Sequence, residues 1–197
     1  MPKRKLNNSR ALRIVAAARE EFAWRGFEGA RIDRIARSAG VNKQLLFYYY
    51  HSKRGLYHAV LAQAAAELEA ALEAAAARGG PPLERLRATL TAQFDYLARR
   101  PELATLLTHD APGAVAPFAP AMRRLVVLVA EGQGRGQVRD DLDPHLVAAQ
   151  ALVLMLGFLR LEKLVTASAR PLAATEAGLR GRWQRAATDL VIAGVRA

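Results

Sequence analysis

The chain has 197 residues, no cysteine, 52% hydrophobic residues and a formal net charge of +11. This length and composition are typical of one or two globular domains with a buried core, and the lack of cysteine excludes disulfides, thiolate metal sites and cysteine nucleophiles. The charge is uneven, because residues 1–57 carry 13 Lys and Arg against four Asp and Glu, whereas residues 58–197 carry a net charge of only +2. Such a basic segment is what a nucleic-acid partner requires, and the charge alone fits a solvated basic surface without a partner equally well.

Three helices are predicted within the first 50 residues. Apolar residues recur at helical spacing from Leu12 to Ala23, and Gly26 is expected to end that helix. Apolar residues within 32–36 mark a second, short helix, which Gly40 interrupts. A third is expected over Asn42–Tyr50, with the asparagine as its N-cap.

The rest of the chain is also predicted to be helical, so the expected fold class is all-α with about nine helices. The fourth helix is expected to be capped by Ser52 and is rich in alanine from Ala59 to Ala77. The other five helices are expected over about 83–99, in a short stretch after Pro101, over about 120–133, over about 144–168 and from about Thr175. Prolines between Ala111 and Pro120 predict a loop or broken helix. Gly132, Gly134 and Gly136 predict a turn. The uncharged run His145–Leu159 is expected to be a buried helix, too short to span a bilayer.

The second and third helices form a candidate helix-turn-helix. Ala36 is small enough for the point where the two helices cross, and Gly40 tolerates the positive φ of a tight turn. Val41 can anchor the turn in the core, and Asn42 caps an outward-facing helix. The start of that helix is where a recognition helix meets base edges.

Polar side chains follow at once. Lys43 suits the acceptors of guanine, and Gln44 can bond adenine in two places. Leu46 and Tyr50 are four residues apart and can share the core face of this helix.

Two tyrosines would then be exposed. Tyr48 and Tyr49 could place their hydroxyls on phosphate oxygens. The alternative is that residues 47–50 are only the core and rim of a small helical domain.

The ordered residues around this unit resemble the N-terminal DNA-binding domain of TetR-family (tetracycline-repressor-like) regulators. The resemblance covers about residues 10–57 and lies in Gly26-Phe27, Ile32-x-x-Ile35-Ala36-x-x-Ala39-Gly40-Val41-Asn42-Lys43 and Leu46-Phe47-Tyr48-Tyr49-Tyr50-x-Ser52-Lys53-x-x-Leu56-Tyr57. It implies a three-helix DNA-binding domain, a larger variable helical domain, a homodimer and contacts from Lys43 through Tyr49. It also implies a phosphate contact from Lys53.

Four positions depart from the family pattern. Ala30-Arg31 stands where threonine or serine is usual before the second helix, so a hydroxyl cap is lost and the arginine can replace its phosphate contact. Phe47 lacks the hydroxyl of the usual tyrosine, and Arg54 replaces a common acid. Tyr50, usually phenylalanine, needs a partner for its hydroxyl or a place at the surface.

These observations define two predicted domains, a helix-turn-helix domain over 1–57 and a ligand-sensing and dimerisation domain over 58–197. The predicted DNA-binding residues are Arg31, Asn42, Lys43, Gln44, Tyr48, Tyr49 and Lys53. The stretch 131–144 is similar to a segment that many family members carry before their last two helices. The resemblance implies a four-helix dimer interface from helices near 143–168 and 175–195; the alternative is an intrachain core.

An effector pocket is expected between the fifth, seventh and eighth helices. Its candidate lining is Phe94, Leu97, His109, Phe118, Met122, Met155 and Phe158. Methionine and aromatic side chains suit an adaptable apolar site, although each also suits plain core. An apolar or aromatic effector is therefore expected.

No catalytic or metal-binding constellation is visible. The four histidines lie far apart, at 51, 58, 109 and 145, and no phosphate-binding loop is present. We expect no enzyme activity, no cofactor, no membrane partner and a cytoplasmic location, since no apolar stretch follows the basic start. The predicted function is a sequence-specific transcriptional regulator, a repressor that an effector releases from a two-fold-symmetric DNA operator. The alternatives are a non-specific DNA-binding protein and a helical ligand-binding module without operator recognition.

Overall fold

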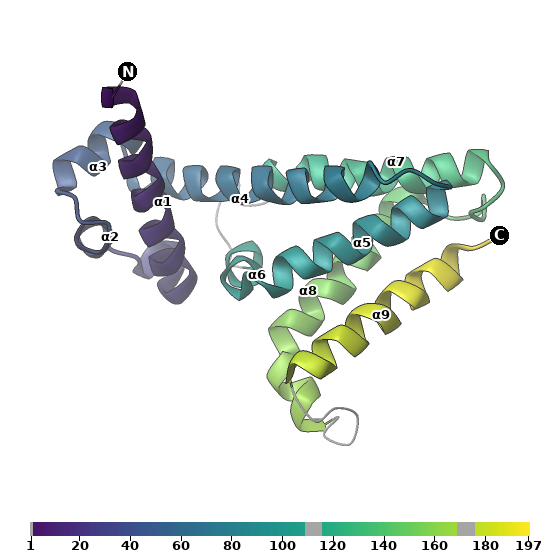
Figure 1. Ribbon diagram of the computed structural model, residues 1–197. Coiled ribbons are helices and arrows are strands. Elements are labelled where there is room, and N and C mark those ends of the chain that lie inside the picture. The colour runs from purple at the N-terminus through teal and green to yellow at the C-terminus, as the bar shows by residue number, and fades with distance from the viewer. Residues whose placement is uncertain (1, 109–115, 169–175) are drawn as a thin grey trace. The chain divides into compact units, whose positions relative to one another are not determined.

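The structure, a computed structural model, describes residues 2–108, 116–168 and 176–197, with the side chains of residues 2–8, 108, 176 and 177 left out. The described residues contain nine α-helices and no strand, which confirms the all-α prediction (Figure 1). The helices are α1 Pro2–Gly29, α2 Ile32–Ser38, α3 Lys43–Tyr50, α4 Lys53–Ala76, α5 Pro82–Ala98, α6 Pro101–Thr108, α7 Ala119–Gly134, α8 Pro144–Ser168 and α9 Glu176–Val195, with a 3-10 turn at Ala116–Phe118.

Helix ends coincide with residues whose chemistry stops or starts a helix. Gly26, with φ 67° and ψ 178°, breaks α1 before its last turn, as expected. Gly40 adopts a φ of 64° between α2 and α3. Asn42 and Ser52 accept hydrogen bonds from the main chain three residues on and so cap α3 and α4. Part of the predicted break at 111–120 lies outside the described residues; α7 begins at Ala119.

The chain divides into two compact units. Unit 1 comprises Met1–Ala66 and Thr105–Pro117, and unit 2 comprises Glu67–Ala104 and Phe118–Ala197. The predicted domain boundary at residue 57 falls inside α4, which continues without a break from unit 1 into unit 2. Helix α4 therefore contributes residues to both units.

The core of unit 1 is built where α1 to α4 meet. Phe22, Ile35 and Leu46 are fully buried, one from each of the first three helices. Tyr57 of α4 joins them, with its ring edge-on to Phe22 at 5.0 Å between centroids. Burial of these large apolar side chains holds the helix-turn-helix on its scaffold.

The core of unit 2 is formed by α5, α7, α8 and α9. Aromatic rings lie at its centre: Phe158 stacks on Trp183 at 4.6 Å and contacts Phe94 at 6.0 Å. The Gly132-x-Gly134-x-Gly136 stretch ends α7 in a turn, as predicted, with a φ of 64° at Gly136. The buried members of this core are Leu86, Leu90, Phe94, Leu125, Leu128, Val129, Val138, Val147, Ala148, Ala151, Met155, Phe158, Leu179, Ile192 and Val195.

Helix α8 has the predicted bounds but is less buried than predicted. It extends beyond the uncharged run to span Pro144–Ser168, 25 residues, and is long and apolar enough by composition to cross a membrane. Only 28% of its most apolar window is buried within the chain. The predicted helix over about 144–168 is therefore confirmed, whereas the expectation that it is buried was wrong, because α8 has a buried face and an uncovered apolar face.

Candidate nucleic-acid interface and cavity

The turn between α2 and α3 has the geometry that the sequence predicted. Ala36 and Ala39 are buried at the helix crossing, and Val41 donates its main-chain N–H to the carbonyl of Ala36 at 2.9 Å. The positive φ of Gly40 lets the chain reverse within this turn. The side chain of Val41 is half-buried rather than fully enclosed.

Asn42 sets the start of α3. Its Oδ1 accepts the main-chain N–H of Leu45 at 2.7 Å, so this N-cap was predicted correctly. The next two side chains, Lys43 and Gln44, are exposed in the first helical turn. The Lys43 ammonium lies 3.1 Å from Oδ1 of Asp33 in α2, a partner that sequence reasoning did not identify.

The aromatic residues of α3 divide between core and surface. Leu46 is fully buried, and Tyr50 is half-buried with its hydroxyl donating to the carbonyl of Ala11 at 3.0 Å. Burial raises the pKa of Tyr50 above its ordinary value. Tyr48 is 74% exposed, as expected, whereas Tyr49 is half-buried and packs edge-on against Tyr48 at 5.6 Å.

Lys53 is bound within the chain. Its Nζ donates to the main-chain carbonyl of Glu28 at 2.9 Å and lies 5.0 Å from the centre of the Phe27 ring. These contacts tie the first residue of α4 to the end of α1. A lysine ammonium has three donors, so a phosphate contact requires Lys53 to share or leave this position.

Glu21 of α1 supplies the side-chain hydrogen-bond acceptor that the start of α2 lacks. Arg31 is the N-cap of α2 and provides no side-chain cap, as its sequence predicts. Oε1 of Glu21 instead accepts the main-chain N–H of Arg31 at 3.1 Å and lies near Arg25 and Arg34, at 3.8 and 3.7 Å. The Arg31 side chain itself is exposed.

Gly55 was also missed by sequence reasoning. A Cβ atom at this position would lie 2.2 Å from the main-chain oxygen of Tyr50. Only glycine therefore allows the first turn of α4 to approach the end of α3 this closely. The signal in the sequence was a glycine in the first turn of a helix that Ser52 already caps.

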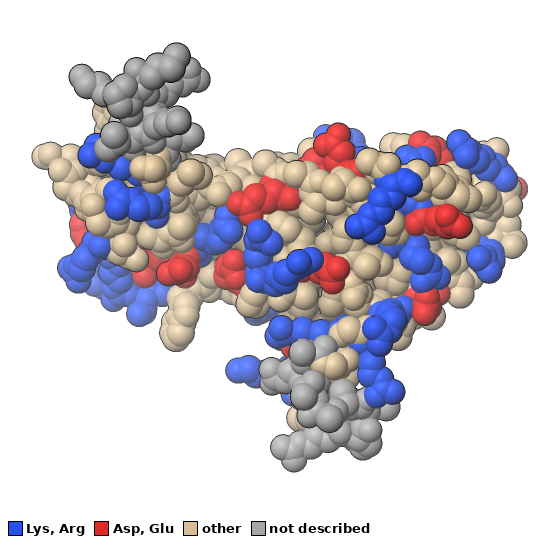
Figure 2. All heavy atoms as spheres, in the orientation of Figure 1, with Lys and Arg blue, Asp and Glu red and all other residues tan. Residues whose placement is uncertain are grey.

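The basic charge is concentrated on unit 1. In the face drawn in Figure 2, Lys and Arg side chains gather around α1 to α3, and acidic and basic side chains alternate over unit 2. This distribution agrees with the net charge of the first 57 residues. It gives unit 1 the positive field that attracts a polyanion.

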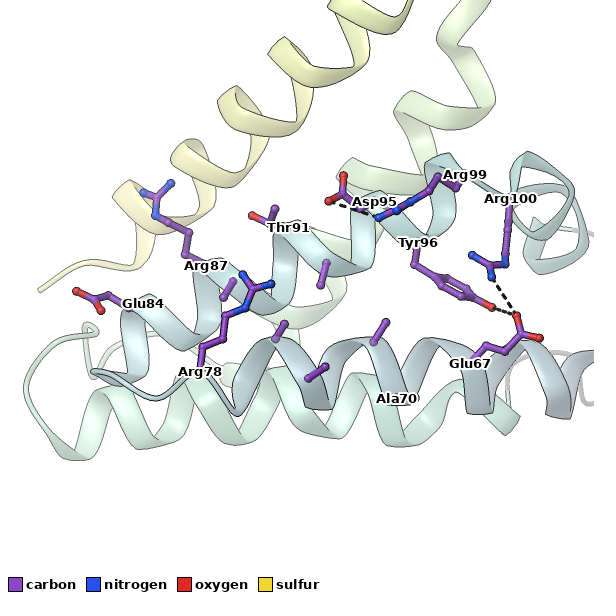
Figure 3. A pocket seen from close by; sticks show the side chains of 15 residues that line it. Glu67, Ala70, Arg78, Glu84, Arg87, Thr91, Asp95, Tyr96, Arg99 and Arg100 are labelled. Atoms are coloured by element: carbon purple, nitrogen blue, oxygen red, sulfur yellow. Dashed lines mark hydrogen bonds and ion pairs between the residues drawn. The ribbon is translucent and has the colours of Figure 1, made fainter.

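Unit 2 contains a cavity of about 970 Å³ between α4 and α5 (Figure 3). The middle of this cavity is lined by alanines from both helices, and its ends carry charged side chains. The lining residues are Glu67, Ala70, Ala71, Ala74, Ala75, Arg78, Glu84, Arg87, Ala88, Thr91, Ala92, Asp95, Tyr96, Arg99 and Arg100.

A small polar network lies at one end of the cavity (Figure 3). The Tyr96 hydroxyl donates to Glu67 at 3.1 Å, and Arg100 lies 3.4 Å from the same carboxylate and over the Tyr96 ring. At the other end, Arg87 pairs with Asp189 of α9. The cavity thus has an apolar middle and polar ends.

The candidate pocket residues do not line this cavity. Phe94, Leu97, Phe118, Met155 and Phe158 are buried. Met122 packs, half-buried, against the core of unit 2. His109 lies outside the described residues. Ligand contact by these residues remains a prediction, and in this structure it would require the core to open.

An uncovered apolar surface runs along α8 and α9. Gly157 and Gly194 lie on these two helices, and the space beside them is open, since a Cβ at either position would meet nothing within 4 Å. Its exposed large apolar residues are Leu146, Val153, Leu161, Leu164 and Leu190. Isolated apolar side chains are normal on a surface, but a row of this size marks an interaction site.

The described residues contain no cluster of three or more His, Asp or Glu side chains that could hold a metal ion. Unit 1 offers hydrogen-bonding groups and positive charge, and unit 2 offers an apolar surface and a cavity.

Comparison with known proteins places this arrangement in context. Residues 14–60 match the family described as bacterial regulatory proteins, tetR family. The HTH-type transcriptional repressor SCO4008 of Streptomyces coelicolor is 35% identical over 136 residues, which cover 65% of this chain and 67% of the relative. The HTH-type transcriptional repressor NicS of Pseudomonas putida is 29% identical over 139 residues, covering 66% of each.

The whole fold also has a solved counterpart. The transcriptional regulator SCO4942 from Streptomyces coelicolor superimposes with a TM-score of 0.74 at 27% identity, covering 91% of this chain and 96% of that one. The likeness therefore extends beyond the residues that carry the basic helix-turn-helix.

Proposed function

Because this chain belongs to the TetR family of bacterial regulatory proteins, we propose that it represses transcription as a homodimer on a two-fold-symmetric operator and leaves that operator when a small molecule binds unit 2. Family membership makes the chain a sequence-specific DNA-binding transcriptional regulator and not an enzyme. It argues against the two alternatives, a non-specific DNA binder and a ligand-binding module without an operator. The observation that carries the proposal is the capped, outward-facing start of α3 on a basic unit.

The proposed reading surface is the exposed side of α3. Lys43 and Gln44 reach base edges in the major groove, where their donors and acceptors discriminate between base pairs. Tyr48 and Tyr49 contribute hydroxyls to phosphates on one side, and Arg31 contributes a guanidinium at the start of α2. These contacts would fix the register of the helix on the duplex.

The proposed dimer forms through α8 and α9. The exposed apolar row and the open surface at Gly157 and Gly194 support close packing against the same helices of a second copy. Pairing of these faces would cover the side of α8 that its own chain leaves bare. Two recognition helices then address half-sites about 34–36 Å apart, one turn of DNA.

The proposed effector site is the cavity between α4 and α5. Its alanine-lined middle accepts an apolar or aromatic body without any repacking, whereas the candidate residues Phe94, Met155 and Phe158 are closed in the core. Helix α4 runs from the residue after the Ser52 cap to the cavity wall. A ligand that displaces the cavity part of α4 would therefore change the spacing of the recognition helices and favour release.

A dye tests this site without knowledge of the natural effector. We expect 8-anilinonaphthalene-1-sulfonate to fluoresce on binding the wild-type protein, and Ala92→Phe to abolish saturable binding by filling the cavity. Ala77→Phe adds the same ring on an exposed position outside the cavity and serves as the control. Equal dye binding by both variants would contradict the assignment.

Selection from a random duplex library at about 150 mM salt tests operator binding directly. We expect enrichment of a site with two-fold symmetry. A library that binds without enrichment would support the non-specific alternative, and a lack of binding would leave unit 2 as the functional part of the chain.

A further inference from the structure

Asp33 is an exception on the proposed reading surface. Between Arg31 and Tyr57 the sequence contains six Lys and Arg and a single acidic residue, Asp33. DNA phosphates repel a carboxylate, so this side chain opposes the attraction that its basic neighbours create. An acid at this position therefore does not increase the attraction of the unit for DNA, and its role must be sought in its contacts with neighbouring side chains.

The contact of Asp33 is with the first residue of the recognition helix. Its Oδ1 lies 3.1 Å from Nζ of Lys43, and the two side chains are 66% and 53% exposed, respectively. An ion pair this exposed contributes little to folding stability. Its main consequence is to restrict where the lysine ammonium, on its flexible four-carbon stem, spends its time.

We infer that Asp33 is a specificity-determining residue, which holds Lys43 in the position that reads a base and competes with phosphates for it. This inference rests on the operator binding proposed above. The ammonium has three donors, so one bond to Asp33 leaves two for the O6 and N7 acceptors of a guanine. On a non-operator duplex Lys43 would gain only a phosphate contact, and Asp33 weakens that gain. The carboxylate thus lowers non-specific affinity more than operator affinity.

The test compares Asp33→Asn with Glu20→Gln on the selected operator and on a random duplex. Glu20 is an exposed acid on α1 that borders Ser38 and Gly40 but forms no ion pair with Lys43 among the described residues, so the control removes the same charge without releasing the lysine. We expect Asp33→Asn to tighten random-duplex binding roughly 3- to 10-fold and operator binding by less than about twofold. The salt slope on the random duplex should steepen by about 0.9, the value for one added phosphate contact.

A second background shows whether Asp33 acts through Lys43. In a Lys43→Ala chain, the Asp33→Asn change should alter the ratio of the two affinities by less than about twofold. Equal tightening on both duplexes, as the Glu20→Gln control is expected to show, would overturn the inference. If the wild-type protein binds the operator and the random duplex equally, both the proposed function and this inference are wrong. If the wild-type protein prefers the operator and Asp33→Asn leaves the ratio of the two affinities unchanged, only this inference is wrong.

Discussion

The hydroxyl of Tyr50 donates a 3.0 Å hydrogen bond to the main-chain carbonyl of Ala11, 39 residues earlier, and so ties the end of the recognition helix to α1. Tyr57 provides the contrast, because its hydroxyl is buried and has no hydrogen-bond partner among the described residues. The two phenol hydroxyls of unit 1 thus have opposite effects on folding stability. The first stabilises the position of α3, and the second carries a desolvation cost.

Replacing each phenol by a phenyl ring separates these contributions. Tyr50→Phe should lower the free energy of unfolding by about 1 kcal/mol, because one hydrogen bond is lost. Tyr57→Phe should leave it unchanged or raise it by about 1 kcal/mol, because a buried group without a partner is removed. Urea unfolding followed by circular dichroism measures both; equal losses in the two variants would contradict the assigned contacts.

The same residue predicts a pH dependence. Burial raises the pKa of Tyr57 above its ordinary value of 10.0, so the folded chain holds the phenolic proton more tightly than the unfolded chain. The folded state therefore loses stability as the pH rises from the unfolded pKa through the folded one, and it shows no such loss below the unfolded pKa. Between about pH 8 and about pH 10.5, Tyr57→Phe should lose less stability than the wild-type protein. An identical alkaline loss in both would contradict the burial of this hydroxyl.

Gly55 predicts a steric effect. Gly55→Ala should destabilise the fold by roughly 1–3 kcal/mol, because the new Cβ would meet the Tyr50 oxygen at 2.2 Å and the main chain must shift. Gly181→Ala is the control, since its Cβ in α9 would meet only the Arg185 guanidinium, at 3.8 Å. There alanine should be neutral or stabilise by up to about 1 kcal/mol. The thermal unfolding temperature should fall for Gly55→Ala and should not fall for Gly181→Ala, and a stable Gly55→Ala would be evidence against the close approach.

Local chemistry explains why the helices and the turn could be predicted from the sequence. Gly40, Asn42 and Ser52 act on main-chain groups within three residues of themselves, and the structure confirms each. Leu46 follows from helical periodicity alone. Contacts of this kind depend on spacing along the chain, so a sequence displays them directly.

Contacts between distant residues explain what was missed. Arg31 donates to Glu21 and Tyr50 donates to Ala11 across 10 and 39 residues of chain, and neither spacing predicts the partner. The same holds for the cavity, because alanines on α4 signal helix propensity whether or not the facing helix leaves a gap. Met155 shows the converse: its residue type suits a pocket, and the structure packs it into the core.

The recognition helix carries the next prediction. Lys43→Ala should weaken operator binding at least about tenfold, because a base-reading group is lost, and Tyr49→Phe should weaken it less, because one phosphate contact is lost. Arg135→Ala removes one exposed positive charge from the turn after α7 of unit 2 and controls for net charge. Fluorescence anisotropy with the selected operator measures all three. Wild-type affinity in the Lys43 variant, with its helical content intact, would be incompatible with the proposed reading surface.

The uncovered face of α8 predicts the oligomeric state. Val153→Glu places a charge in the exposed apolar row and should convert the dimer to monomers, because the interface would bury that carboxylate without a partner. Val127→Glu is the matched control, since this valine is similarly exposed but lies on α7. Sedimentation velocity at micromolar concentration reports the state of each variant. The monomer should also lose operator affinity by roughly 100-fold or more, because two linked half-site contacts become one. A Val153→Glu protein that remains dimeric would place the interface elsewhere, and a Val127→Glu protein that dissociates would move it to α7.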